Sequence, residues 1–577
     1  MVGPDAVLAL FVAAGRALHQ DWLASPPHRW LTSLPAPHGF AAQPRDLRPP
    51  DLENARRILA GGFVFAGVTL AVGPGGDPWD RPSPDRRFAL ALHRFAWLRD
   101  LAAQGEQGAA DGLRLVLDWR RVFGRWNAFS WSPEALERRV FNLACAAKRI
   151  CARASEAEAA LIATLLARQA RHLLDVGGGP ARAAERAAAA AVAGAALGGP
   201  AGDRLLARAL RRLEPALAAS VAEDGGHASR SPQAALELLF DLQTLDEALT
   251  HRSQAAPEAV QRAIDRLAGA VRFFTLADGR LPAFQGGEPL TAAYVAAARA
   301  EELGERVPKG LGGYQRLDSP RLQVMVDAAA PAAGPWSQAA CAQPLAMEAL
   351  AGGHRLVTGV AWSPDAQGPQ ALRLADAAST ATLGEAPCGE PLGGFAAEAL
   401  GPRLTGACRV QADRQEADGA VLVELSHDGW AARSGLVHHR RLYLDTATGE
   451  LRGEDRFAPA RPVSGAAGRR FIPFVVRFHL APGVSALVSR DRRSVLLKLG
   501  DDEAGWQLRN DALDAAIEPS LHHEDGQPRR TQQIVLRGQA RADSGARIRW
   551  KLAPAPALPA DTAMAPAYEI GSLLDSR

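Results

Sequence analysis

The stretch FVVRFHL at residues 474–480 alternates apolar and polar side chains. Its even-numbered positions are all apolar and share one face of an extended strand, so Arg477 and His479 lie on the opposite face, where we expect them to meet solvent. The same pattern recurs in several short segments, namely 321–327, 436–444, 494–499 and 532–537. Turn sequences such as Thr448-Gly449 separate these segments, and no helical pattern intervenes. This part of the chain is therefore predicted to form an antiparallel β-sandwich.

The first half of the chain has a different period. Apolar residues recur every three or four positions over 88–101, 235–249 and 260–274, which predicts helices. Pro232 and Pro257 stand where two of these helices would begin. The alanine- and arginine-rich run 181–219 is either low-complexity sequence or tightly packed helices, and its interleaved leucines favour helices. Successive helices of this kind form an α/α toroid or a bundle, and the period alone does not choose between them.

The change of period near Arg306 sets the domain boundaries. We expect a helical domain over 1–305, a glycine-containing linker over 306–313 and a sandwich over 314–553. The proline- and alanine-rich tail, 554–577, is expected to be a loose strap or disordered.

Composition excludes several classes of protein. In 577 residues, 47% are hydrophobic and 22% are charged, which is typical of a globular protein. The net charge of +3 and the lack of a basic patch interleaved with aromatics argue against nucleic-acid binding. The five cysteines are odd in number and lack C-x-x-C spacing, so neither a disulfide scaffold nor a zinc ribbon is predicted. A reducing compartment is the simpler interpretation.

The N-terminal region contains an apolar stretch, residues 6–18, that is preceded by no basic leader and followed by polar residues. We interpret it as an amphipathic first helix rather than a signal peptide. No stretch reaches the roughly 20 apolar residues that a membrane span needs. The sequence by itself thus predicts a cytoplasmic protein with no transmembrane segment.

Several local strings, in order along the chain, resemble the heparinase II/III family of alphaproteobacterial type. They are LHRFAWL (92–98), DGGHASRSP (224–232), GYQRL (313–317), SHDGW (426–430), GLVHHRR (435–441), LRGED (451–455), RFHL (477–480) and TQQIVL (531–536). The resemblance implies an incomplete α/α toroid followed by an antiparallel β-sandwich. It also implies a lyase that cleaves a uronate-containing acidic polysaccharide, glycosaminoglycan-like or bacterial exopolysaccharide, by β-elimination.

That reaction requires neutralisation of the uronate carboxylate, a base for the adjacent proton and an acid for the leaving oxygen. His227 matches the family position that contacts the carboxylate, and a protonated His227 or Arg230 would supply the neutralising charge. His438 also matches the family. The resemblance thus implies a catalytic set of His227, Arg230 and His438, with substrate binding by Ser229, Tyr314 and Arg316. The alternative for His227 and Arg230 is a purely structural role beside the helix that begins near Pro232.

Other family positions have changed. Cys341 and Ala378 stand where the family carries histidines, and the position that supports its metal falls near Gly359. Glu348 persists, and none of the four tyrosines matches the expected acid/base position. One thiol is not enough to hold zinc, so we predict no metal and no other cofactor.

Three functions fit these observations. The first is a polysaccharide lyase with its site between the two domains. The second is a catalytically silent relative that binds or helps to process an anionic envelope glycan. The third is an envelope-biogenesis protein that modifies a glycan of its own cell. The family resemblance implies a location in the periplasm or cell envelope. The sequence by itself, with no signal peptide recognised, predicts the cytoplasm. The substrate and the oligomeric state are not predicted.

Overall fold

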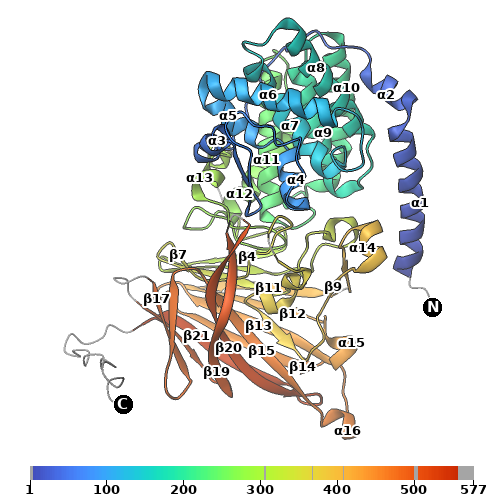
Figure 1. Cartoon of the computed structure of the whole chain (residues 1–577). Helices are drawn as coiled ribbons and strands as arrows, with labels where there is room; N and C mark the ends of the chain where they lie inside the picture. Colours follow the sequence, from blue (N-terminus) through green and yellow to red (C-terminus); the bar gives the residue numbers. More distant parts are fainter. Residues whose placement is uncertain are drawn as a thin grey trace, which may run out of the picture.

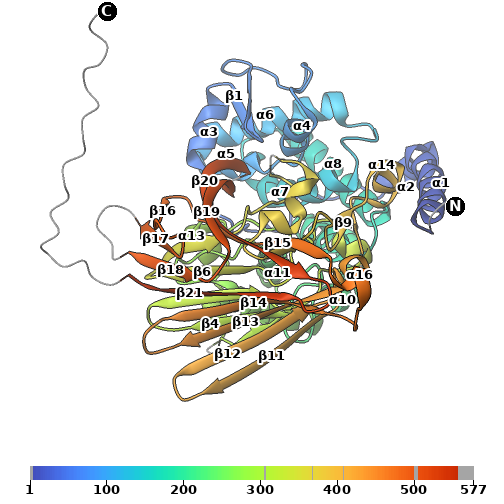
Figure 2. The ribbon, with the colours of Figure 1, turned by 90° about the horizontal axis from the view of Figure 1, so that it is seen from below.

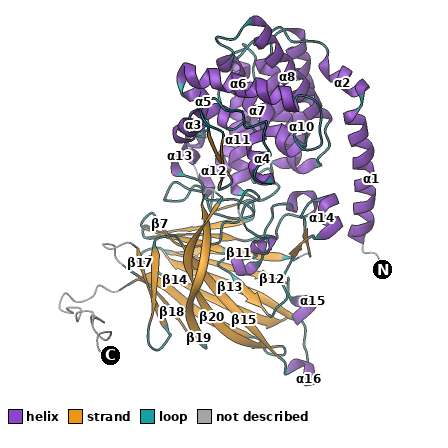
Figure 3. Ribbon diagram, viewed as in Figure 1, coloured by secondary structure: helices purple, strands orange, loops and turns teal. Residues whose placement is uncertain are grey.

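The computed structural model describes residues 4–304, 307–366, 368–406, 408–499, 505–524 and 526–555. An α-helical domain stands on a β-sandwich, and the helices and strands are segregated along the chain (Figures 1 and 3). The predicted fold class, an α/α toroid followed by an antiparallel sandwich, is confirmed. Within the predicted linker, residues 310 and 311 form a short strand. The expected tail lies outside the described residues from position 556 onward.

The helical domain contains helices of very different lengths. They are α1 (Pro4–Ala24), α2 (Pro26–Ser33), α3 (Leu52–Leu59), α4 (Arg86–His93), α5 (Trp97–Ala103), α6 (Gly105–Phe123), α7 (Pro133–Ile150), α8 (Glu156–Asp175), α9 (Ala183–Ala196), α10 (Gly199–Ser220), α11 (Pro232–Thr250), α12 (Glu258–Phe274) and α13 (Ala292–Ala296), with the short 3₁₀ turns η1 (Pro180–Arg182) and η2 (Ala300–Leu303). A hairpin of β1 (Gly62–Phe65) and β2 (Val68–Ala71) lies among them. The helical pattern over 88–101 is divided between α4 and α5, because Phe95 adopts a φ of +61°.

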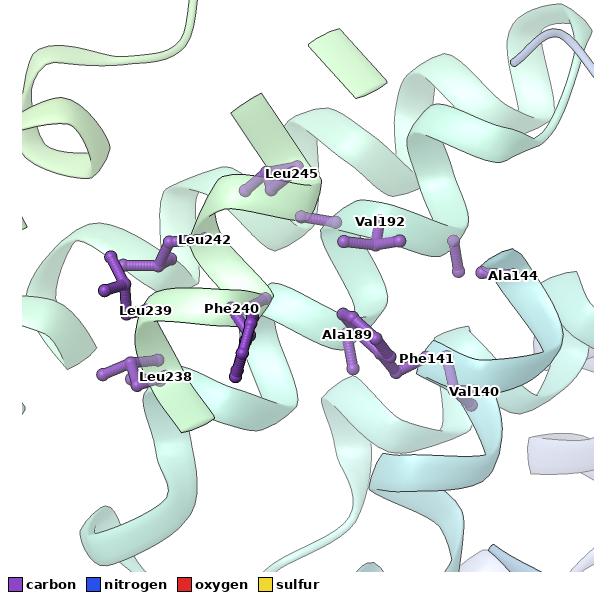
Figure 4. Packing of buried hydrophobic residues seen from close by; sticks show 14 of the residues in the cluster. Val140, Phe141, Ala144, Ala189, Val192, Leu238, Leu239, Phe240, Leu242 and Leu245 are labelled. Atoms are coloured by element: carbon purple, nitrogen blue, oxygen red, sulfur yellow. The ribbon is translucent and has the colours of Figure 1, made fainter. Parts of the chain in front are cut away.

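The alanine-rich run forms the centre of this domain. Its residues divide between α9 and α10, and the side chains of α9 from Ala184 to Ala196 are all buried. Figure 4 shows α9 lying between apolar side chains of α7, such as Phe141, and of α11, such as Phe240. A Cβ on Gly194 would lie 2.6 Å from the backbone nitrogen of Leu206 in α10. Small residues therefore allow neighbouring helices to approach α9 closely, so the run is packed helix rather than low-complexity sequence.

The sandwich consists of two large antiparallel sheets (Figures 1 and 2). One has the order β11 (Val410–Ala417), β12 (Ala420–His427), β13 (Leu436–Asp445), β14 (Leu451–Pro459), β21 (Ala546–Pro554), β18 (Trp506–Asn510), β17 (Ser494–Leu499) and β16 (Val484–Val488). The other has the order β19 (Asp514–Glu524), β20 (Gln527–Arg541), β15 (Phe471–Leu480), β7 (His354–Thr358), β6 (Met347–Ala351), β5 (Leu322–Asp327), β4 (Tyr314–Asp318) and β3 (Gly310–Leu311), and β8 (Ala381–Leu383) also pairs with β15.

Smaller elements connect and flank these sheets. They are β9 (Glu390–Pro391), β10 (Leu404–Thr405), α14 (Gly394–Leu400), α15 (Ala431–Ser434), α16 (Gly465–Gly468), and the 3₁₀ turns η3 (Gly334–Ser337), η4 (Gln370–Arg373) and η5 (Ala375–Ala377).

The predicted strands lie within observed strands, except that β5 begins at Leu322, one residue later than predicted, and FVVRFHL is the end of β15. Its even-numbered side chains are buried between the sheets, and the ring of Phe474 lies 4.5 Å from that of Phe457 in β14. The expectation that His479 meets solvent is wrong. It is buried, with Nδ1 2.7 Å from Ser520 Oγ and Nε2 3.0 Å from the Asp376 carbonyl, because β19 and η5 cover this face of the strand.

Candidate active site at the domain junction

The glycine-rich loop that carries His227 connects α10 to α11 at the face of the helical domain that meets the sandwich. Gly225 has a φ of +91°, and a Cβ there would lie 2.2 Å from the Arg266 carbonyl. Only glycine fits this close approach. Val221 and His227 form an isolated antiparallel bridge that closes the loop. The local sequence therefore holds the His227 side chain in one inward orientation.

The His227 ring is buried, and its two nitrogens have different environments. Nδ1 lies 2.7 Å from Ser229 Oγ and accepts the Ser229 backbone N–H at 3.2 Å, so the proton of the neutral ring lies on Nε2. Nε2 lies 4.0 Å from Glu185 Oε1 and has no hydrogen-bond partner among the described residues. Burial, followed by the charge of Arg182, lowers the pKa of His227 to about 3. At neutral pH this ring is uncharged, and an uncharged ring does not neutralise a uronate carboxylate.

Glu185 was missed by the sequence analysis, together with the charged residues around it. It lies in the first turn of α9, and Arg182 Nη1 is 3.4 Å from its Oε1. Arg182 also bonds to Glu137 of α7. Burial raises the pKa of Glu185, whereas the pKa of Glu137 is lowered, because Arg182 outweighs the burial of that carboxyl. The signal in the sequence was the group of charges Arg182, Glu185 and Arg186 at the start of an otherwise alanine-rich segment.

The Glu185–His227 pair resembles an acid–base dyad in its chemistry, since a carboxyl with a raised pKa faces a neutral imidazole. The ring of Trp336 in η3 covers His227 at 5.9 Å. Only 2% of the Glu185 side chain and 2% of the His227 side chain are exposed. A polysaccharide therefore does not reach the dyad in this conformation.

The Arg230 side chain forms its hydrogen bonds across the domain junction. Its φ is +62°, and its guanidinium donates to the backbone carbonyls of four residues of the sandwich domain and its linker, Gly312, Gly313, Ala329 and Ala330. It also forms an ion pair with Asp327 Oδ1 at 2.5 Å. These contacts occupy all three guanidinium nitrogens, so Arg230 connects the loop before α11 to the sandwich and holds no charge free for a substrate.

Two of the predicted substrate-binding residues have similar roles. The Tyr314 hydroxyl donates to the Arg230 carbonyl at 2.8 Å, and its ring lies under the Arg230 guanidinium, 4.7 Å away. Arg316 donates to the carbonyls of Phe273 and Thr275 at the end of α12. The third, Ser229, orients His227 through its hydroxyl.

His438 lies elsewhere, inside the sandwich on β13. Its Nε2 is 2.8 Å from Asp455 Oδ1, and its ring stacks on Phe457 at 5.1 Å. Arg440 bonds to the same carboxylate and holds the pKa of Asp455 below its usual range despite burial. His438 contacts other residues of the sandwich, namely His427, Asp455 and Phe457, whereas His227 contacts Ser229, Glu185 and Trp336. The structure therefore brings together His227, Ser229 and Arg230, and it does not bring His438 to them.

The three family positions that have changed, two expected to be histidines and one expected to support a metal, do converge. Cys341, Gly359 and Ala378 line one hollow beneath the helical domain, with Phe284, Trp362 and Ser379 among its other walls. Its volume is about 10 Å³, room for about one water molecule. Burial raises the pKa of the Cys341 thiol to about 11. Since the thiol is the one metal-ligating side chain of those three positions, this donor set does not fit zinc.

Glu348, the family residue that persists, also accepts hydrogen bonds from other residues of the protein. It accepts the Ala283 backbone N–H at 2.9 Å, Arg355 Nη1 at 2.7 Å and the Thr358 hydroxyl at 3.2 Å. Among the described residues, no cluster of three or more His, Cys, Asp or Glu side chains has an arrangement that could hold a metal ion. The described helices also include none that is long and apolar enough to cross a membrane.

A helical toroid followed by a β-sandwich is also the fold of heparinase III. The chain belongs to the heparinase II/III family. Residues 306–551 match the family model described as heparinase II/III-like, C-terminal. This confirms the resemblance on which the sequence analysis relied.

The chain is also similar to individual proteins, at two levels of sequence identity. The chain is 50% identical over 551 residues to FtsZ-localized protein C of Caulobacter vibrioides, which covers 94% of this chain and 95% of that protein. Among solved structures, a heparinase III has a TM-score of 0.67 at 15% identity, covering 87% of this chain and 84% of its own. A heparan sulfate lyase mutant from Pedobacter heparinus has a TM-score of 0.57 at 14% identity, covering 97% and 92%. At these identities the lyases share the fold alone.

Proposed function

We propose that this chain is a heparinase II/III-family protein that retains the lyase fold as a binding scaffold, acts together with FtsZ, and does not cleave polysaccharide. The observation that carries this proposal is the commitment of Arg230 to five acceptors of the domain junction. A β-elimination site needs a positive charge that is free to meet the uronate carboxylate. Here that charge is compensated by Asp327, and the neighbouring His227 is neutral.

The hollow lined by Cys341 and Ala378 supports the same interpretation. Neither Cys341 nor Ala378 supplies an imidazole to this hollow, and its volume of about 10 Å³ is too small for a sugar ring. The association with FtsZ rests on the relative of 50% identity, which carries FtsZ localisation in its name. Two proteins that similar over almost their whole lengths are expected to share a binding role.

The test combines an activity assay with localisation. The purified full-length chain is incubated with heparan sulfate, heparin, chondroitin, hyaluronan and alginate, and ultraviolet absorbance from an unsaturated uronate is followed. In parallel, a fluorescent fusion is expressed in Caulobacter vibrioides cells that lack the relative and carry labelled FtsZ. We expect no absorbance change and a fusion that coincides with FtsZ. Cleavage of any of these glycans, or a fusion spread evenly through the cell, would overturn the proposal.

The second candidate is the lyase itself, and the Glu185–His227 dyad is the observation that favours it. Opening of the Trp336 contact would expose a neutral imidazole beside a carboxyl with a raised pKa, which is a usable base. This candidate predicts glycan cleavage that disappears in both His227→Ala and Glu185→Gln. Arg441→Ala, on the outer face of the sandwich, would leave such cleavage unchanged.

A further inference from the structure

Three neighbouring strands of the sandwich, β14, β21 and β18, expose one face to solvent (Figure 2). Along them buried side chains alternate with exposed or half-buried ones, because the other face packs against the second sheet. The outward positions carry one carboxylate, Glu454, and six cations, which define what we call the basic face. These cations are Arg452, Arg456, Arg509, Arg547, Arg549 and Lys551. Since the net charge of the whole chain is +3, positive charge is concentrated on this face.

Like charges lie directly opposite one another across the basic face. Lys551 has Arg452 as its register partner on one side and Arg509 on the other. Arg456 and Arg547 form a second pair of like charge. Neighbouring strands are about 4.8 Å apart, and like charges that face each other across a sheet destabilise it. The protein by itself gains no stability from this arrangement, whereas a bound anion would relieve the repulsion.

Carboxylates of the protein compensate only part of this charge. Glu450 accepts Arg452 Nε at 2.7 Å and Lys551 Nζ at 2.8 Å, so one carboxylate serves two cations. Glu454 accepts Arg549 Nε at 3.1 Å. No described carboxylate forms an ion pair with the remaining cations of the face, Arg456, Arg509 and Arg547. Half of the cations are therefore free to meet an external acid.

The basic face contains a groove with apolar as well as charged walls. Its volume is about 500 Å³, and Leu422, Tyr443, Arg452 and Arg509 are among the residues that line it. Leu422 of β12 and Tyr443 of β13 lie in the same row across the sheet as Arg452. The Arg452 guanidinium lies over the Tyr443 ring, 5.7 Å from its centre. Tyrosine and arginine are enriched at the centres of protein–protein interfaces.

We infer that the basic face binds an acidic segment of a protein partner, whose carboxylates meet Arg509 and Arg547 and whose apolar side chains contact Tyr443 and Leu422. Charge complementarity selects this occupant, because a second copy of the chain would bring two positive faces together. A polysaccharide with a charge on every repeat would be repelled by Glu454 within the groove, whereas a peptide is able to place an uncharged residue there. The inference does not depend on the identity of the partner, so it stands apart from the proposed association with FtsZ.

The first test is the binding of a short fluorescein-labelled peptide, in which glutamates alternate with leucines and glycines, to the full-length chain. Fluorescence anisotropy measures its Kd. Arg509→Glu with Arg547→Glu should raise this Kd at least about tenfold, because each reversal opposes like charges. The matched control is Arg125→Glu with Arg211→Glu, two exposed arginines of the helical domain that form no ion pair with a described residue. It should leave the Kd unchanged. A wild-type chain that does not bind, or equal affinities of the two variants, overturns the inference.

Thermal unfolding of the same variants separates binding from folding. Arg547→Glu puts a carboxylate opposite Arg456, so a repulsive pair becomes attractive and the melting temperature should not fall. A residue that served only the fold would lose stability together with binding. If the double reversal melts far below wild type, Arg509→Gln with Arg547→Gln takes its place, because it introduces no new charge. Unchanged peptide binding by that variant overturns the inference.

Competition distinguishes a peptide from a polysaccharide. Heparan sulfate and alginate oligosaccharides, and the unlabelled peptide, are each added to the complex of the chain with the labelled peptide. We expect the unlabelled peptide to displace the label at a lower concentration of carboxylate than either glycan does. Displacement by a glycan at the lower concentration, together with loss of glycan binding in Arg509→Glu with Arg547→Glu, would assign the face to an anionic polysaccharide and overturn the protein partner.

Discussion

Arg230 and Asp327 form an ion pair of 2.5 Å that joins the two domains, with 11% and 1% of their side chains exposed. Arg230 comes from the loop before α11, and Asp327 is the last residue of β5. Gln285 Nε2 also donates to Asp327, at 2.8 Å. Arg230, which the family resemblance placed in the catalytic set, thus has a structural partner that compensates its charge.

Replacement of Arg230 by alanine should therefore destabilise the protein. The carboxylate of Asp327 would remain buried without its cation, and loss of one partner of a buried ion pair costs about 3–5 kcal/mol. The measurement is urea unfolding followed by tryptophan fluorescence. Arg441→Ala is the matched control, since its ion pair with Glu424 is about half exposed and should contribute about 0–1 kcal/mol. Equal effects of the two substitutions would contradict a junction role for Arg230.

The stability of the protein should also depend on pH through His227. Its pKa is about 3 in the folded chain, because of burial and then Arg182, and the usual value is 6.5. Between these values the unfolded chain binds a proton that the folded chain does not bind. The free energy of unfolding therefore falls as the pH drops from 6.5 toward 3, and His227 contributes no pH dependence above about 6.5.

His227→Gln removes this titration, so the variant should lose less stability than wild type on acidification. Since one pKa unit corresponds to about 1.4 kcal/mol, the difference between pH 6.5 and pH 5 should be about 2 kcal/mol. Urea unfolding at pH 5, 6.5 and 7.5 measures it. His251→Gln, at an exposed position, serves as the control. Parallel pH profiles for wild type and His227→Gln would show that the ring takes up its proton at the same pH in the folded protein as in the unfolded chain.

The sequence predicted the strands and the helices because periods of two and of three to four are properties of the side chains themselves, whereas the choice of a toroid over a bundle came from the family resemblance. It also placed His227 on its loop, since two glycines mark that loop. It did not predict the partners of His227 and Arg230. Glu185 lies on a helix about 40 residues earlier, in an alanine run without an amphipathic period. Four of the five acceptors of Arg230 are backbone carbonyls, and the identity of the side chains in a sequence does not indicate where such carbonyls lie.

The loop that positions His227 should depend on Gly225. A Cβ at this position would lie 2.2 Å from the Arg266 carbonyl, and the φ of +91° is unfavourable for any other residue. Gly225→Ala should cost about 1–3 kcal/mol in thermal or urea unfolding. Gly269→Ala in α12 is the matched control, because its nearest atom is the end of Arg272 at 3.8 Å. That substitution should stabilise the helix by about 0.5–1 kcal/mol, and a comparable loss at both glycines would argue against a special role for Gly225.

Restoring the family histidines should not restore a catalytic centre. In Cys341→His with Ala378→His, two imidazoles would enter a hollow of about 10 Å³, and an overfilled core costs about 1–3 kcal/mol per site. The charge of Arg230 would still be compensated by Asp327. We therefore expect a lower melting temperature, no zinc in the purified variant by elemental analysis, and no unsaturated uronate from the glycans tested above. The control is Cys341→Ser with Ala378→Ser, whose side chains are smaller than imidazoles. Its melting temperature should be closer to that of the wild type. Glycan cleavage by the histidine variant would mean that the lost imidazoles alone silenced the site and that the Arg230 contacts open when substrate binds.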